Sequence, residues 1–298
     1  MLQYKSFHYR LAYNLFRYAV IISRRKILAQ QFPVKHFAVH QYRLHVGWIP
    51  LFTVLYAAVP EKKQQGQKVS RLLLDRADEL YNANRYEETY NSLKEYQDTD
   101  DVEVLWRLSR ALYSHSKQER DSKKKKELVA ESFRLIKHAL SLEKDNWAVH
   151  KWYAVLLDAN ASHEGIKARI SELTNVKHHL QKAAELNPTD ATTLYMLGSW
   201  CYGIADMPWY QRKIASTLFA TPPYSSYEEA LSYFLKAEET DPNFYSLNLL
   251  MLGKSYMQLQ NPERAKHYLK LASLYPAKTD EDFEATKEAT ELLKKIKL

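Results

Sequence analysis

The sequence predicts an all-α protein in which about five helix pairs stack into a right-handed superhelix with a C-terminal capping helix. The 298 residues include only six glycines, whereas sheet proteins need frequent turn residues. Apolar residues recur at spacings of three and four through most of the chain, which is the period of an amphipathic helix. A repeated motif is the third observation, and it predicts how the helices pair.

The clearest copy of the motif covers two helices on either side of a long insertion. Gly198 lies in the first helix, and Ala230, Phe234 and Ala237 follow in the second helix, which ends before Pro242. Small residues let paired helices approach closely, and the aromatic ring fills the gap to the next repeat. This spacing is typical of the tetratricopeptide repeat.

Further copies of the motif fill the rest of residues 69–298. Gly253 and Tyr256 lead to Ala265 and Ala272 in a second good copy. Three weaker copies lie upstream, with first helices near Leu73, Leu105 and Val149 and second helices near Tyr86, Phe133 and His179. Together these copies predict about five helix pairs.

The last predicted helix opens at Thr279–Asp282 and runs to Leu298. Acidic residues stand at its positive end and three lysines at its negative end, an arrangement that the helix dipole favours. A stack of helices needs a polar terminal helix to cover its apolar end. We therefore expect this segment to be the capping helix.

Residues 1–60 form a leader whose composition differs from that of the repeat region. The leader contains no Asp or Glu and eight Lys or Arg. An acid-free, Arg-containing, apolar N-terminus is typical of mitochondrial targeting. The uncharged stretch Val46–Pro60 suggests membrane contact instead, although it is too short to span a bilayer. A disordered tail or an apolar strap on the domain is the third interpretation, and residues 61–68 are predicted to be a polar linker.

The formal charge of +8 does not indicate a nucleic-acid partner, because all of it belongs to the leader. The chain holds 43 Lys and Arg against 35 Asp and Glu, so removing the eight basic residues of the leader leaves a balanced remainder. Nucleic-acid binding needs a basic surface on the folded domain. The sequence therefore predicts no nucleic acid among the partners.

The stretch 198–223 supplies the first group of candidate site residues. Pro208 should end one helix, and a short amphipathic segment follows before Pro222-Pro223. Its residues Trp209, Tyr210 and Arg212 could hold a ligand, or they could lock the insertion onto the stack. A second insertion covers 160–175. We expect both insertions along one edge of the superhelix, where they would line or narrow its concave groove.

The second group of candidates is a dense basic run, Lys123, Lys124, Lys125 and Lys126. The run could meet the acidic tails of tubulin or an anionic membrane surface. Charge runs also serve solubility alone. The alternative interpretation is therefore a solvated loop between two helices.

Catalytic motifs are absent from the sequence. It contains no phosphate-binding glycine loop, no dinucleotide-binding glycines, no His-Glu-x-x-His and no Gly-x-Ser-x-Gly. His178 and His179 are adjacent and point apart on a helix, so they do not predict a metal site. Cys201, the single cysteine, is expected in the core. We predict a protein without enzymatic activity, cofactor or metal.

Several sequence blocks, at 150–154, 164–168, 207–212, 218–223 and 241–245, resemble the regulator of microtubule dynamics protein family. The resemblance covers about residues 70–295 and is greater to the short, first-numbered member than to the longer membrane-anchored members. It implies a tetratricopeptide-like fold, microtubule association and a location in the cytoplasm at spindles and spindle poles. A longer relative tethers mitochondria to the endoplasmic reticulum and binds phospholipid.

Two functions of different classes follow from these observations. The first is a non-enzymatic helical-repeat scaffold that associates with microtubules and the mitotic spindle, with microtubules or spindle proteins as partners. The alternative is a mitochondrial or membrane-associated lipid-binding module at organelle contacts, with phospholipid or a membrane surface as partner. The leader distinguishes them, because a protein imported into mitochondria would not meet tubulin.

Overall fold

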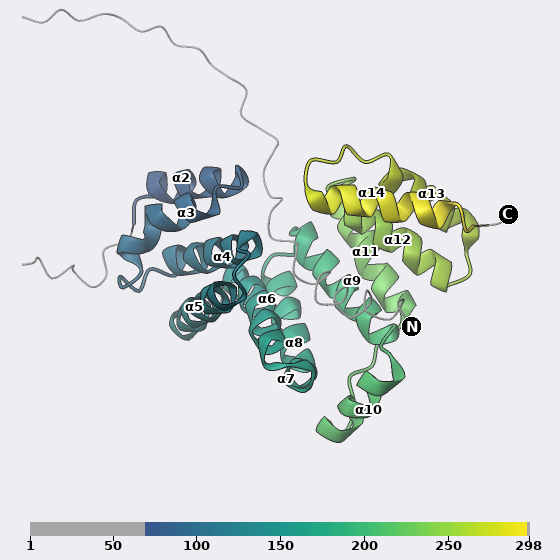
Figure 1. Ribbon diagram of the computed structural model, residues 1–298, viewed down its shortest axis with the longest axis horizontal. Helices are drawn as coiled ribbons and strands as arrows, with labels where there is room; N and C mark the ends of the chain where they lie inside the picture. Colours follow the sequence, from purple (N-terminus) through teal and green to yellow (C-terminus); the bar gives the residue numbers. More distant parts are fainter. Residues whose placement is uncertain (1–68, 297–298) are drawn as a thin grey trace, which may run out of the picture. The chain divides into compact units, whose positions relative to one another are not determined.

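The computed structural model describes residues 69–296, which fold into α-helices joined by short connections (Figure 1). The predicted leader (1–60) and linker (61–68) lie outside the described residues. No strand occurs between residues 69 and 296, so the predicted all-α class is confirmed there. The helices are α2 (Arg71–Asn82), α3 (Tyr86–Leu93), α4 (Val102–Gln118), α5 (Ser122–Leu142), α6 (Trp147–Glu164), α7 (Ile166–Ser171), α8 (Leu173–Leu186), α9 (Ala191–Ala205), α10 (Trp209–Leu218), α11 (Tyr227–Thr240), α12 (Ser246–Gln258), α13 (Pro262–Ser273) and α14 (Asp280–Leu293).

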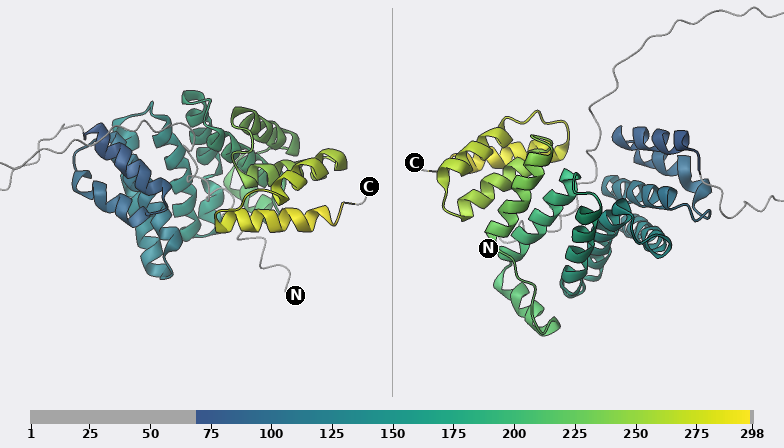
Figure 2. Two further views of the ribbon diagram at one scale, coloured as in Figure 1. Left: turned by 90° about the horizontal axis from the view of Figure 1, so that it is seen from above. Right: turned by 180° about the vertical axis from the view of Figure 1, so that it is seen from behind.

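The helices pack as five pairs, as the repeated motif predicts. The pairs are α2 with α3, α4 with α5, α6 with α8, α9 with α11, and α12 with α13 (Figure 2). The short helices α7 and α10 are insertions, each lying in the chain between the two helices of a pair. Helix α14 packs on both α12 and α13, which is the position of a capping helix.

Side-chain caps begin several of these helices. The carboxylate of Asp101 accepts a hydrogen bond from the amide of Glu103 at 2.9 Å, and Asn146 caps α6 in the same way through Ala148 at 3.0 Å. Thr279 and Asp282 form a reciprocal capping box at the start of α14. Such caps satisfy amide groups that a helix leaves without an internal partner. They explain why α4, α6 and α14 start where they do.

Helix α14 ends earlier than the sequence predicts. It stops at Leu293 and not at Leu298, and residues 297–298 lie outside the described residues. Lys294 and Lys295, directly beyond the helix, are exposed. They add no burial, and burial of an apolar face supplies most of the stability of a helix in a protein.

Glycines at matching positions of two repeats allow the paired helices to approach closely. A Cβ atom on Gly198 would lie 2.6 Å from the ring of Phe234, and one on Gly253 would lie 2.6 Å from Leu269 Cγ. Both Phe234 and Leu269 are fully buried. The predicted close contact of α9 with α11, and of α12 with α13, is therefore confirmed by side chains that leave no room for a methyl group.

Helix α9 forms the centre of the core. All residues from 191 to 204 are buried, in contrast to the one-sided burial of an ordinary surface helix. The ring of Tyr195 lies 5.4 Å from that of Phe234 and 5.5 Å from that of Tyr245, measured between centroids. The first contact lies within the fourth pair, and the second joins this pair to Tyr245, the residue directly before α12 of the fifth pair.

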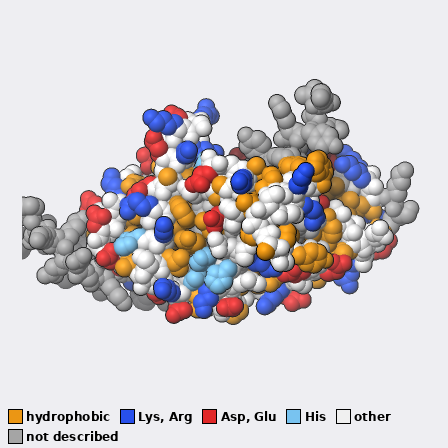
Figure 3. Space-filling model, turned by 90° about the horizontal axis from the view of Figure 1, so that it is seen from below, with side chains coloured by type: hydrophobic (Ala, Val, Ile, Leu, Met, Phe, Trp, Pro, Cys, Tyr) orange, Lys and Arg blue, Asp and Glu red, His pale blue; other side chains and the backbone are white. Residues whose placement is uncertain are grey.

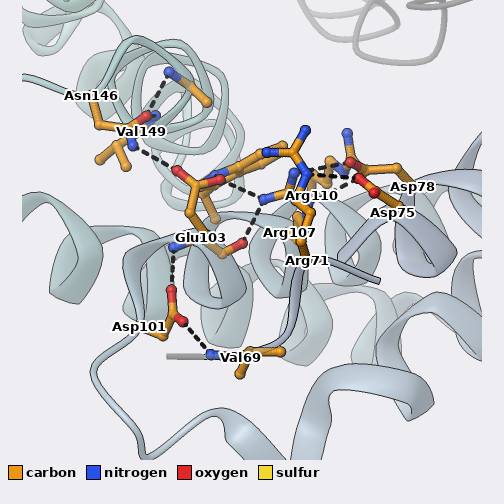
Figure 4. Close-up of polar contacts among 12 residues, drawn as sticks. Val69, Arg71, Asp75, Asp78, Asp101, Glu103, Arg107, Arg110, Asn146 and Val149 are labelled. Carbon is orange, nitrogen blue, oxygen red and sulfur yellow. Dashed lines mark hydrogen bonds and ion pairs between the residues drawn. The ribbon is translucent and has the colours of Figure 1, made fainter. Parts of the chain in front are cut away.

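A network of charged side chains joins the first three pairs (Figure 4). The guanidinium of Arg107 on α4 donates to both carboxylate oxygens of Asp78 on α2, at 3.0 and 2.9 Å, and Arg110 donates to the same carboxylate. Arg107 also donates to Glu103 at 2.6 Å, and Glu103 accepts from Asn146 before α6 at 3.0 Å. Paired, bidentate contacts of this kind fix both distance and orientation. The network thus sets how α2, α4 and α6 follow one another.

A pair of histidines, His150 and His179, joins α6 to α8. Sequence reasoning did not predict this contact, because it considered only the neighbours His178 and His179. The Nδ1 atoms of His150 and His179 lie 2.8 Å apart, and His150 Nε2 lies 2.8 Å from the carbonyl oxygen of Lys144. A carbonyl oxygen only accepts, so His150 carries its proton on Nε2. The contact between the two Nδ1 atoms joins α6 to α8 by a hydrogen bond in which one ring donates and the other accepts.

We predict that Gly198→Ala lowers the free energy of unfolding by about 1–3 kcal/mol, the usual effect of overfilling a packed core. The added methyl group would collide with the ring of Phe234, which is fully buried and cannot move aside. Chemical denaturation of the full chain measures the change. Lys266→Ala, at an exposed position of α13, serves as the control. Equal stability of the two variants would contradict the close helix contact.

We also predict that stability falls as pH decreases from about 6.5 to about 4. Burial lowers the pKa of His179 from 6.5 to about 4, and the rings of His150 and His178 add to this effect. Between these values the unfolded chain binds a proton that the folded chain does not, so acid favours unfolding.

Thermal melting across this range measures the dependence. His179→Phe should flatten it, whereas His267→Gln, at an exposed position of α13, should leave it unchanged. If both variants keep the slope of the unsubstituted chain, another group causes the dependence.

Candidate functional site

The connections within the helix pairs lie on one edge of the stack. Paired helices run in opposite directions, so the end of the first helix lies beside the start of the second. Stacking the pairs brings these connections into a row. Both insertions belong to this row, because α7 connects α6 to α8 and α10 connects α9 to α11. Helices α7 and α10 also contact each other (Figure 1). The prediction that the two insertions share an edge is therefore confirmed.

The first insertion is fixed by a buried ion pair. Gly165 ends α6 with a φ of 109°, a conformation that favours glycine, and it turns the chain into α7. Arg169 Nε on α7 then donates to Asp158 Oδ1 on α6 at 2.7 Å. Burial raises the pKa of Asp158, and the guanidinium of Arg169 opposes this rise. The pair anchors α7 and leaves its first residue, Ile166, 43 % exposed.

The second insertion is fixed by Arg212. The sequence correctly predicts that α9 ends before Pro208, and α10 begins immediately after this proline. Arg212 on α10 reaches back to the end of α9, where Nε donates to the carbonyl oxygen of Met207 at 2.9 Å and Nη2 to that of Ala205 at 2.8 Å. These carbonyl groups have no partner inside the helix. Arg212 thus locks the insertion onto the stack, the alternative role that the sequence leaves open for it.

Trp209 and Tyr210 lie at the start of α10. The Trp209 side chain is 76 % exposed, and its ring stands nearly perpendicular to that of Tyr210, with 6.1 Å between centroids. Tyr210 is half-buried and accepts a hydrogen bond from Gln211 at 3.3 Å. Large apolar side chains in a fold usually gain stability from burial. Trp209 gains little stability from burial, because its side chain is mostly exposed. Packing therefore does not explain why a tryptophan stands at this position.

The basic run lies on a helix, so the interpretation as a solvated loop is wrong. Lys123–Lys126 occupy the first turns of α5, where Asp121 caps the helix by accepting from the amides of Lys123 at 2.8 Å and Lys124 at 3.3 Å. The Lys124 ammonium pairs with Glu119 at 2.8 Å, and that of Lys123 lies 4.0 Å from Glu127. Lys125 is half-buried and the other three lysines are exposed.

The electrostatics of this helix start are unfavourable for lysine. The N-terminus of a helix carries partial positive charge, which disfavours cations there. The hydrogen bond from Lys124 and two backbone amides lowers the pKa of Glu119 to about 2. Burial lowers the pKa of His163, and the ammonium groups of Lys126 and Lys125 lower it further. The lysines open α5, which packs against α6, and α6 leads directly into α7.

The candidate residues thus form one surface, which we call the insert edge and define as Lys123–Lys126, α7 and α10. The lysines follow the connection within the α4–α5 pair, α7 and α10 lie in the corresponding connections of two later pairs, and α10 contacts α7. Viewed from the side on which α7 and α10 lie in Figure 1, the molecule shows hydrophobic patches with Lys and Arg side chains around them (Figure 3). Sequence reasoning treated the two groups of candidates separately and missed Ile166, Lys167 and Arg169.

The described part of the chain contains little that could perform chemistry. Burial raises the pKa of the Cys201 thiol to about 12, which keeps it protonated and unreactive at neutral pH. Between residues 69 and 296 there is no group of three or more His, Cys, Asp or Glu that could hold a metal ion. In the same region no helix is both long and apolar enough to cross a membrane. The predicted core position of Cys201 is confirmed.

The fold is similar to that of a solved tetratricopeptide-repeat protein. The crystal structure of this protein from Thermus thermophilus superposes with a TM-score of 0.50, covering 74% of this chain and 98% of that one. The sequence identity is 14%, so the likeness concerns the fold alone. It confirms the tetratricopeptide-like arrangement that the Gly198 and Gly253 repeats predict.

Sequence comparison gives closer relatives. Regulator of microtubule dynamics protein 1 from Pongo abelii is 48% identical over 222 residues, which cover 74% of this chain and 71% of the relative. Regulator of microtubule dynamics protein 3 from Xenopus laevis is 36% identical over 228 residues, which cover 49% of its length. The family model for regulator of microtubule dynamics protein 1-3 matches residues 73–297. The chain therefore belongs to the regulator of microtubule dynamics family and, of these two relatives, is more similar to protein 1.

Proposed function

We propose that this protein is a non-enzymatic helical-repeat scaffold that associates with microtubules and the mitotic spindle in the cytoplasm. Membership of a family whose members are named regulators of microtubule dynamics carries the proposal. The family match spans nearly all of the described helices, so the proposal concerns the repeat domain itself.

The arrangement of charged groups supports a binding role. Most of the buried charges in the described repeats are paired between segments, as in Arg107 with Asp78, Arg169 with Asp158, and Lys151 with Asp190 at 2.7 Å. A catalytic acid, base or nucleophile must instead be able to reach a substrate. Pairs of this kind serve the architecture, whereas Lys123, Lys124 and Lys126 lie at the surface, where a partner can reach them.

Lys123–Lys126 are the residues that we propose as contacts for tubulin. Exposed lysines attract acidic surfaces at long range and speed association. Screening by salt weakens such attraction, because the Debye length falls to about 3 Å at 1 M salt. The association should therefore depend on ionic strength.

We predict that the full chain pellets with polymerised tubulin at low salt and that the pelleted fraction falls steadily as salt is added. Co-sedimentation across a salt series measures this dependence, with a tubulin-free sample as the control for aggregation. Absence from the microtubule pellet at low salt would refute the proposal.

A second candidate function is a mitochondrial or membrane-associated lipid-binding module at organelle contacts. The acid-free leader favours it, with eight basic residues in 1–60. In this case the partner is phospholipid or a membrane surface.

Imaging of a C-terminally tagged chain with and without residues 1–60 separates the two candidates. The microtubule proposal predicts spindle and spindle-pole signal in both forms, since the family match begins at residue 73. Mitochondrial signal that disappears when the leader is removed would favour the second candidate. The same fusion lacking only residues 61–68 controls for the change in length.

A further inference from the structure

We propose that the insert edge binds an extended, glutamate-rich segment of the partner, with the lysines of α5 and of the two insertions contacting its carboxylates and Trp209 contacting its apolar groups. The inference rests on the proposed function and names the surface and the partner chemistry. It extends the proposed contacts from Lys123–Lys126 to residues of the insertions α7 and α10.

The first argument concerns charge. Lys123, Lys124 and Lys126 are exposed at the helix end where cations are least favourable, and surface ion pairs with Glu127 and Glu119 offset this cost only in part for Lys123 and Lys124. Lys167 on α7 and Lys213 on α10 are also exposed. The basic side chains thus continue from α5 along both insertions.

The second argument concerns rigidity. Arg169 holds α7 through Asp158, and Arg212 holds α10 through the carbonyl groups of Met207 and Ala205. A surface that is already ordered loses little conformational entropy when a partner binds. The anchors hold the exposed side chains of both insertions in position.

The third argument concerns Trp209. An isolated exposed apolar residue is ordinary, but tryptophan is the residue type most enriched among those that dominate binding energy. Trp209 is 76 % exposed on α10, and Ile166 is 43 % exposed on α7. Both stand on the outer side of insertions whose inner residues, Ile170 and Ala215, are buried in the core. They give the basic surface an apolar component.

Acidic residues within the surface decide the class of partner. Asp121, Glu164, Glu172 and Asp206 lie in the same connections as the lysines. A flat anionic membrane would meet these carboxylates together with the ammonium groups, and like charges repel. A flexible chain can place its own carboxylates beside the lysines and avoid the acidic positions. The mixed pattern therefore favours an extended peptide over a membrane.

The test measures binding of a fluorescent synthetic peptide of alternating Glu and Gly to the full chain by anisotropy. We expect Lys123→Gln/Lys124→Gln/Lys126→Gln to weaken binding about tenfold, the sum of three exposed charge contacts. Trp209→Ala should weaken binding to a peptide that also carries Leu residues by about fivefold, and binding to the Glu-Gly peptide much less.

Matched controls separate this surface from the rest of the chain. Lys137→Gln/Lys266→Gln/Lys270→Gln removes three exposed lysines from α5 and α13 outside the insert edge. Arg24→Gln/Arg25→Gln/Lys26→Gln removes three charges from the leader. Both should leave peptide affinity nearly unchanged, and circular dichroism checks that every variant is folded. If either control variant loses as much peptide affinity as Lys123→Gln/Lys124→Gln/Lys126→Gln does, the proposal is overturned. This triple substitution is called the α5 variant below.

Two further measurements distinguish the other outcomes. If the α5 variant loses binding to phosphatidylserine vesicles but keeps its affinity for the peptide, the surface is a membrane site and the proposal fails. If the variant pellets with microtubules as well as the unsubstituted chain does, the proposal fails while the proposed function stands. If the variant loses peptide binding but the unsubstituted chain never pellets with microtubules, the function fails and the acidic-peptide site stands.

Discussion

Antiparallel pairing of helices is the constraint on which the rest of this structure depends. It brings the connections within successive pairs to one edge, so any segment inserted there is displayed in a row and not scattered over the surface. The pairing itself depends on close contact, as where Phe234 packs against Gly198 and Leu269 packs against Gly253. A methyl group at either glycine would separate the helices and disturb the edge. The core and the proposed binding surface are therefore coupled.

The two insertions differ from the repeats in how they are held. The repeats gain stability from buried apolar faces, whereas α7 and α10 combine one buried apolar residue each, Ile170 and Ala215, with an arginine that satisfies a buried carboxylate or the carbonyl groups at a helix end. The residues at the start of each short helix, Ile166 and Trp209, stay exposed. This explains how neighbouring residues can differ in role, since Arg212 is structural while Trp209 faces solvent.

The sequence was sufficient to predict the class, the number of pairs and the edge that holds the insertions. The motif that contains Gly198, Ala230 and Phe234 recurs along the chain with a spacing typical of paired helices, and Pro208 marks the end of α9. The helical state of Lys123–Lys126 was missed because a run of like charges is typical of a solvated loop. Asp121, a favoured capping residue directly before the run, was the available signal.

Contacts between distant segments could not be predicted. His150 and His179 are 29 residues apart, and their hydrogen bond depends on how α6 packs against α8. Arg169 meets Asp158 only because Gly165 turns the chain between them. Neither pair has a spacing that identifies it, since local periodicity describes one helix at a time. For the same reason the lysines of α5 and the two insertions were recognised as separate candidates.

A distance measurement between the two insertions tests the shared edge most directly. Spin labels on cysteines introduced at the exposed positions 167 and 213, in a chain whose buried Cys201 is replaced by Ala, report how α7 and α10 lie. The account predicts one narrow population of short distances, because the two helices contact each other. A broad distribution or a single long distance would contradict it.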